Sequence, residues 1–154
     1  MSLEELKNTD ATSLPIGKLI TLIYRGHNIF INHHLEKFEI NASQLHLLFE
    51  ISHQIEINQE KIANRCNLNK GSVARSIKKL EEKNLIIRKT DDTNRRQNKI
   101  SLTSKGEETL KESIKILSYW ENEVLNNNII GKKVLQNVLK EIAIKSIELN
   151  QKGE

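Results

Sequence analysis

Residues 59–105 carry the pattern that most constrains the fold, because apolar side chains recur there at helical spacing on both sides of a short turn. The apolar positions are Ile62, Ala63, Leu68, Val73, Ile77 and Leu80. Spacings of three and four residues place side chains on one face of a helix. The pattern therefore predicts two short helices that share a core across the turn.

Asparagines mark both ends of the second predicted helix. Asn69 is a good N-cap, since its side chain can accept a hydrogen bond from the backbone N–H of Ser72. Asn84 tolerates the left-handed backbone conformation that ends many helices. These residues predict a helix from about Lys70 to Lys83.

Two β-like runs follow, at residues 85–89 and 99–102. The polar segment between them, residues 90–98, is too long for a two-residue turn and contains Asp and Asn, which favour turns. Two helices followed by a long hairpin are the layout of a winged helix-turn-helix. We therefore expect a mainly α chain with a small β-hairpin wing, with the winged lobe spanning residues 40–105.

Positive charge is concentrated in this lobe. Residues 70–99 contain ten basic and four acidic side chains, a balance of +6, whereas the whole chain carries +4, so the remainder sums to −2. A Lys-rich helix in isolation is usually only a solvated face. Placed after a helix-turn-helix and before a basic hairpin, it predicts binding to double-stranded DNA.

Long helices with apolar stripes are predicted on both sides of the lobe. The first begins near Pro15, with Ser13 as a possible cap, and carries its stripe to Phe38. A further helix, inside the lobe, is predicted from Ser43, as N-cap, to about His53. Two more are predicted at residues 103–125 and 131–149. Residues 14–39 and 106–150 need a surface on which to bury these stripes. A single copy could pack the first helix against the last two, but the width of the stripe favours a homodimer.

Length and composition bound the remaining possibilities. The 154 residues fit one chain-long domain, and the one cysteine, Cys66, cannot form an internal disulfide. The first ten residues are acidic without an apolar run, and no segment is apolar enough to span a membrane, so we expect a cytoplasmic location. His33 and His34 are adjacent and point apart on a helix, so we expect no metal site and no cofactor.

Several short runs resemble the MarR family of transcriptional regulators, and the resemblance covers nearly the whole chain. The runs are LNKGSVAR at 68–75, KLE at 79–81, NLI at 84–86, DDTNRR at 91–96 and SLTSKG at 101–106. The most specific is an Arg pair followed by Leu-Thr-x-x-Gly. The chain departs from the family at Asn84, where Gly is usual, and at Asn94, where an Asp commonly orients the wing arginine.

The resemblance implies a homodimer that binds a pseudo-palindromic operator, most simply as a repressor released by a small aromatic or anionic effector. Arg75 is the best candidate for direct base readout, since its planar fork can pair with guanine, and Gly71 would let the backbone approach the duplex. Family alignment favours Arg96 for insertion into the minor groove. The complete predicted DNA-binding set is Lys70, Gly71, Ser72, Ala74, Arg75, Ser76, Lys79, Arg95 and Arg96.

The effector site is less well marked in the sequence. Its candidate residues are His27, His34, His46 and Trp120, amphipathic side chains on helices that flank the pocket the resemblance implies. For any one of them, a partly buried structural role is the more usual one. Cys66 falls at the end of the first helix of the helix-turn-helix, where a small packing residue is more usual than a redox sensor.

Two other functions stay open at this point. A winged helix can bind protein instead of DNA, and a basic one can bind DNA without sequence preference. Exposed Lys70, Arg75, Lys78 and Lys79 favour DNA over protein. The sequence contains no phosphate-binding Gly loop and no nucleophile motif, so an enzyme is not expected.

Overall fold

The computed structural model describes residues 1–54, 57–66, 68–90, 98–126 and 130–151. The chain divides into two compact units, Met1–Leu117 and Ser118–Glu154, which are described separately.

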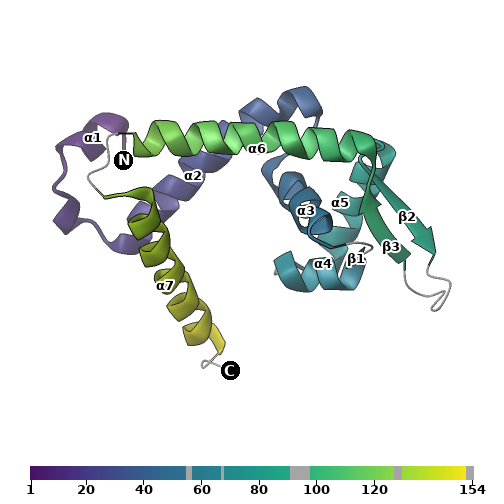
Figure 1. The fold of residues 1–154 in the computed structure, drawn as a ribbon. Helices are drawn as coiled ribbons and strands as arrows, with labels where there is room; N and C mark the ends of the chain where they lie inside the picture. The colour runs from purple at the N-terminus through teal and green to yellow at the C-terminus, as the bar shows by residue number, and fades with distance from the viewer. Residues whose placement is uncertain (55–56, 67, 91–97, 127–129, 152–154) are drawn as a thin grey trace. The chain divides into compact units, whose positions relative to one another are not determined.

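Most of the first unit is helical (Figure 1). Its elements are α1 (Leu3–Asn8), η1 (Ala11–Ser13), α2 (Ile16–Leu35), η2 (Glu36–Phe38), α3 (Ala42–Ser52), β1 (Ile57–Asn58), α4 (Gln59–Cys66), α5 (Lys70–Glu82), β2 (Ile86–Thr90) and β3 (Asn98–Leu102). Helix α6 (Ser104–Leu125) begins in the first unit and ends in the second, which also holds α7 (Lys132–Gln151). The three strands form an antiparallel sheet in the order β1-β3-β2.

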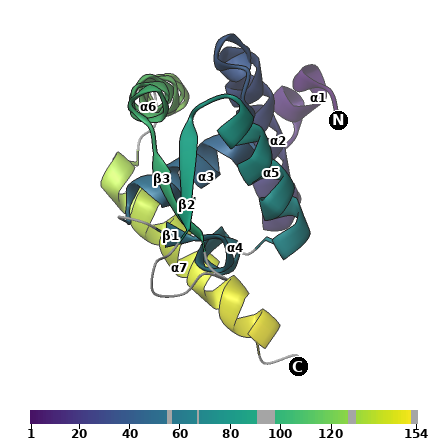
Figure 2. The ribbon, with the colours of Figure 1, turned by 90° about the vertical axis from the view of Figure 1, so that its right-hand side faces the viewer.

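The predicted winged helix-turn-helix is confirmed. Helices α3, α4 and α5 lie beside the three-stranded sheet (Figure 2). Ile62 of α4 and Val73, Ile77 and Leu80 of α5 are fully buried in one core, as the apolar spacing predicts. Ile100 of β3 is also fully buried, so the sheet packs onto the same core.

Some element boundaries differ from the sequence prediction. Helix α3 is capped by Asn41, not Ser43: the Asn41 Oδ1 accepts from the Gln44 N–H at 2.9 Å, and the Gln44 side chain accepts from the Asn41 N–H in return. This reciprocal capping box satisfies two backbone donors, which the Ser43 hydroxyl alone would not do. Pro15 is the N-cap of α2, and Ser13 belongs to η1.

The long N-terminal stripe is also interrupted where continuous helix was predicted. Helix α2 ends at Leu35, and a 3-10 turn carries the chain to Glu39, whose φ of 56° is left-handed. The Lys83 Nζ donates to the Glu39 carbonyl oxygen, so a partner from the end of α5 satisfies this carbonyl. Strand β1 has only two residues and was not predicted.

The junction between α5, β2 and α6 fixes the base of the wing. Asn84 ends the α5 segment with φ 57°, as predicted for this residue. The Thr103 Oγ1 donates to the Asn84 carbonyl oxygen at 2.6 Å and accepts from the Gly106 N–H at 3.0 Å. The Thr103 N–H donates to the Leu85 carbonyl oxygen at 3.1 Å. Both ends of the hairpin are therefore tied to the start of α6.

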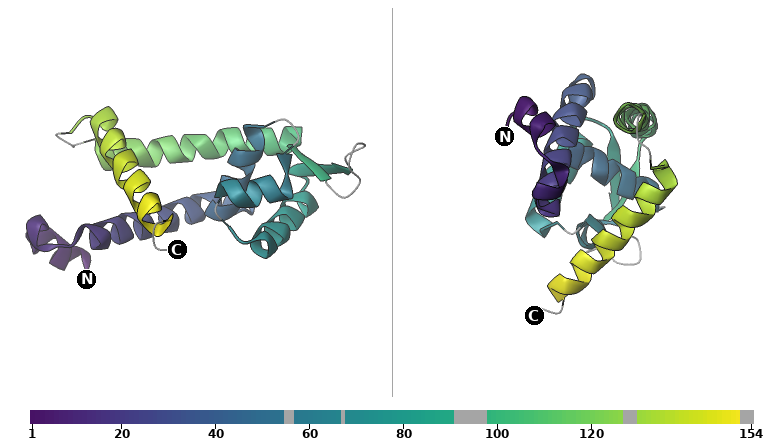
Figure 3. Two further views of the ribbon diagram at one scale, coloured as in Figure 1. Left: turned by 90° about the horizontal axis from the view of Figure 1, so that it is seen from below. Right: turned by 90° about the vertical axis from the view of Figure 1, so that its left-hand side faces the viewer.

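The N-terminal half of α2 carries apolar side chains that its own unit does not bury. Ile16, Ile20, Ile23 and Tyr24 are exposed, whereas Ile31 and Leu35 near its end are buried, and Figure 3 shows that this end reaches the helices of the winged lobe. No residue that the structure describes in α7 is buried. Among the described residues, no helix is long and apolar enough to cross a membrane.

Candidate nucleic-acid interface

One face of α5 is buried and the opposite face is exposed. The start of the helix is held by Asn69, whose Oδ1 accepts from the Ser72 N–H at 2.7 Å, as predicted. Of the predicted contact residues on α5, Lys70, Gly71, Arg75 and Lys79 are exposed, and Ser72, Ala74 and Ser76 are half-buried. The face is compatible with entry into a major groove, which is wide enough for a helix.

Arg75 is oriented by its own helix. Its Nη2 donates to the Ser72 Oγ at 3.2 Å, one turn earlier. The side chain is exposed, so the remaining guanidinium donors face solvent. This hydrogen bond limits the rotamers of a long side chain and lowers the entropy that a bidentate contact would cost.

Lys70 is held differently. Its Nζ lies 2.6 Å from the Glu60 Oε1 of α4, and hydrogen bonding and charge from Lys70 hold the pKa of Glu60 below its usual range. Both side chains are well exposed, so the ion pair itself contributes little stability. A phosphate would have to compete with Glu60 for Lys70.

An ion pair connects the wing to α5. The Arg88 Nε of β2 donates to the Glu81 Oε2 at 2.8 Å, and the Arg88 Nη2 contacts the same oxygen. The hydrogen bond from Arg88 lowers the pKa of Glu81, and the pKa of Arg88 is raised in return. Arg88 is therefore engaged in a structural ion pair, although it is one of the ten basic residues counted in 70–99. Arg95 and Arg96 lie outside the described residues.

Substitution of Gly71 tests whether the backbone of α5 approaches the DNA duplex closely. A Cβ added there would lie 3.6 Å from the Asn69 Oδ1 and 3.8 Å from the Arg75 Nη1, which are ordinary contacts. Gly71→Ala should therefore leave folding intact or stabilise the chain by up to about 1 kcal/mol. We expect DNA affinity to fall nonetheless, because the methyl would occupy space between α5 and the duplex. Thermal melting and fluorescence anisotropy on one duplex measure both effects; unchanged affinity would show that no close approach occurs.

An apolar hollow of about 300 Å³ lies in the first unit between α2, α3 and α6. It is lined by His27, Ile31, Ala42, Leu45, His46, Phe49, Glu50 and Leu117. Two predicted effector residues, His27 and His46, thus share one cavity. His34 does not line it: its Nδ1 donates to the Phe30 carbonyl oxygen at 2.9 Å and its ring stacks on the Phe30 ring. Trp120 belongs to the second unit.

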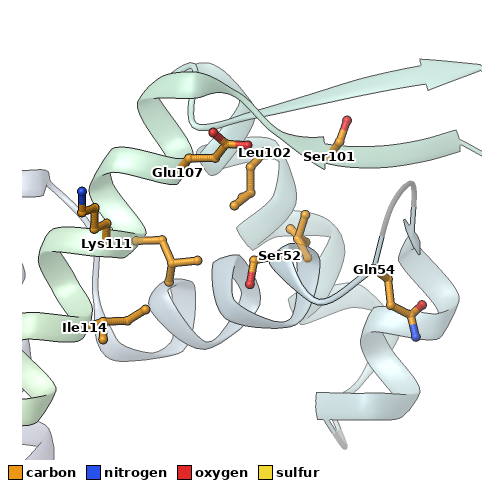
Figure 4. Close-up of a pocket in the computed structure, with 9 residues that line it drawn as sticks. Ser52, Gln54, Ser101, Leu102, Glu107, Lys111 and Ile114 are labelled. Carbon is orange, nitrogen blue, oxygen red and sulfur yellow. The ribbon is translucent and has the colours of Figure 1, made fainter.

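A second hollow, of about 410 Å³, opens between the end of α3, β3 and α6 (Figure 4). Its lining mixes apolar Leu102 and Ile114 with polar Ser52 and Ser101. Glu107 and Lys111 bring opposite charges to it. Sequence reasoning gave no indication of this hollow, because its residues come from two segments far apart in sequence, 51–54 and 101–114.

Cys66 lies against the hydrophobic core and is half-buried. Burial raises the pKa of its thiol, and the nearby Glu50 carboxylate adds to this effect. A thiol kept protonated is a poor nucleophile, which supports the expected packing role. Among the described residues, no group of His, Cys, Asp or Glu is arranged to hold a metal.

Comparison with known proteins gives consistent results. The MarR family model matches residues 40–97. A crystal structure of MarR aligns over 94% of this chain and 99% of its own, with 25% identity and a TM-score of 0.81. A MarR transcriptional regulator from Methanosarcina mazei Go1 aligns over 87% and 97%, with 28% identity and a TM-score of 0.78. MepR of S. aureus, in a structure of its DNA complex, shares the fold at 20% identity over 88% and 98%, with a TM-score of 0.77.

Proposed function

The chain belongs to the MarR family of winged helix-turn-helix regulators, and on this premise we propose that it is a sequence-specific DNA-binding repressor. The observation that carries the proposal is the exposed basic face of α5, with Arg75 held in place by Ser72. The predicted set from Lys70 to Lys79 would read the major groove, and Arg95 and Arg96 would follow the minor groove. The protein acts by binding, not catalysis, in the cytoplasm where its DNA is.

Selection from a pool of random duplexes at two salt concentrations tests this function. We expect a pseudo-palindromic consensus with half-sites about one helical turn apart and an affinity that falls steeply with salt. Salt-sensitive binding without a consensus would indicate a DNA-architectural protein instead. Absence of binding would favour a winged helix that contacts protein.

We also propose a homodimer formed through residues 14–39 and 106–150. The exposed apolar side chains of α2 support it, as do those of α7: Val134, Val138, Leu139, Ile142, Ile144, Ile147 and Leu149. A two-fold dimer would bury them and present two copies of α5. Sedimentation equilibrium should give about 36 kDa, twice the 17.8 kDa of one chain. A monomer at micromolar concentration would contradict this assembly.

Release from DNA is proposed to follow binding of a small aromatic effector in the hollow that contains His27 and His46. Its size and mostly apolar lining suit a small aromatic molecule. The hollow adjoins α3, which packs directly on α4 of the helix-turn-helix. Occupancy there can therefore act on the position of the DNA-reading helices.

A further inference from the structure

The hollow between α2, α3 and α6 contains an unusual charge for an apolar site. Among its eight lining residues that the structure describes, Glu50 is the one that carries a formal charge at neutral pH with neutral histidines. The side chain of Glu50 is 15% exposed. A carboxylate on an apolar wall attracts a cation and repels an anion, because low-dielectric surroundings screen charge weakly.

Glu50 also connects the hollow to the helix-turn-helix. Its Oε2 accepts from the Nε of Arg65 at 2.5 Å, across fifteen residues of sequence. Arg65 lies in the last turn of α4 and is 45% exposed, so water can replace Glu50 as its partner. Glu50 lines the hollow and Arg65 is not among the residues that line it, so of the two paired charges it is the acidic one that belongs to the cavity wall.

We propose that this hollow binds an apolar monocation, such as an aromatic amine, whose positive group takes the Glu50 carboxylate in competition with Arg65. This proposal rests on the proposed function, which takes the hollow as the effector pocket, and it adds the charge of the effector. Family resemblance alone favours an aromatic acid; Glu50 disfavours one. The second hollow carries no such preference, because Glu107 and Lys111 bring opposite charges to it.

The competition supplies a mechanism for regulation. When a cation binds Glu50, the ion pair that joins α3 to the end of α4 weakens, and α4 gains freedom relative to α3. In this scheme the loosened state binds DNA less tightly. A ligand that stabilises the loosened state then lowers the affinity for DNA, and DNA lowers the affinity for the ligand by the same factor. Arg65 is a positioning residue in this scheme.

Three matched probes test the charge preference: 1-naphthylmethylammonium, 1-naphthylmethanol and 1-naphthoate, titrated calorimetrically into the full-length protein at pH 8. We expect the cation to bind about tenfold more tightly than the alcohol, as for a charge-assisted hydrogen bond, and the anion most weakly. Equal affinities, a preference for naphthoate or no binding by any probe would overturn the proposal. These comparisons need no variant, so folding defects cannot obscure them.

Variants then test whether Glu50 causes the preference for the cationic probe. Glu50→Gln should remove it, whereas Glu107→Gln, a matched carboxylate in the other hollow, should retain it. Arg65→Gln should bind the cation more tightly, because the competing partner is gone, yet show a smaller loss of DNA affinity when the cation is added. Weaker cation binding by Arg65→Gln would contradict the competition.

DNA binding by the ligand-free protein is measured separately. If that binding is retained while the cation preference is absent, this inference alone fails. If the ligand-free protein binds no DNA, the proposed function fails, and the calorimetric result still decides the chemistry of the hollow.

Discussion

Replacing Gly106 with alanine is expected to lower the free energy of unfolding by about 3 kcal/mol, the upper range for overpacking at a rigid site. An added Cβ would lie 1.9 Å from the Leu85 carbonyl oxygen and 3.0 Å from its carbonyl carbon. Both are backbone atoms that no rotamer change can move. The same oxygen accepts from the Thr103 N–H, so a shift of Leu85 would also disturb the junction that ties the hairpin to α6.

Urea unfolding followed by circular dichroism measures this loss. Gly26→Ala is the matched control, since Gly26 lies within α2 and nothing approaches its added Cβ within 4 Å. That variant should be neutral or more stable by up to about 1 kcal/mol. If Gly106→Ala and Gly26→Ala both unfolded with the same free energy as the native chain, the close packing of α6 against Leu85 would be contradicted.

Gly106 illustrates what the sequence could predict at one position and what only the structure explains. The Leu-Thr-x-x-Gly motif identified its position through family resemblance, but the motif gave no reason for glycine. The structure provides one: the backbone of α6 passes against the Leu85 carbonyl, and φ is not positive at Gly106. A steric requirement of this kind depends on two segments far apart in sequence, so local pattern does not reveal it.

Features set by neighbouring residues were predicted well. The buried face of α5, its Asn69 cap and the left-handed Asn84 all follow from helical spacing and capping chemistry, and the structure contains each of them. The Asn41 cap of α3 was missed because Ser43, two residues later, is an equally good cap by residue type.

Contacts between separate helices and strands were not predictable in this way. The Glu50–Arg65 and Glu81–Arg88 pairs join residues from different elements, and any of the surrounding charges fits the sequence pattern equally well. Similarly, His27, His34 and His46 looked alike in sequence. Only the packing of α2 on α3 places two of them at a common cavity.

Arg75→Ala is expected to lower affinity for the selected operator by about 1–3 kcal/mol, or roughly five- to 150-fold, and to relax base preference at one position of each half-site. Its fork can pair with guanine, and its hydrogen bond to Ser72 lies within α5, so the substitution removes a contact without disturbing the core. Competition binding with operator variants, each changed at one base pair, measures both effects.

Lys79→Ala is the comparison that separates readout of the bases from electrostatic attraction to the phosphates. Lys79 is exposed on the same helix, one turn after Arg75, and a phosphate contact from it would weaken binding to all sequences alike and reduce the salt slope by about one. Arg75→Lys sharpens the distinction, because it keeps the charge and removes the planar fork. If Arg75→Lys retained full discrimination between operator variants, charge alone would account for Arg75 and base readout would have to come from another residue of α5.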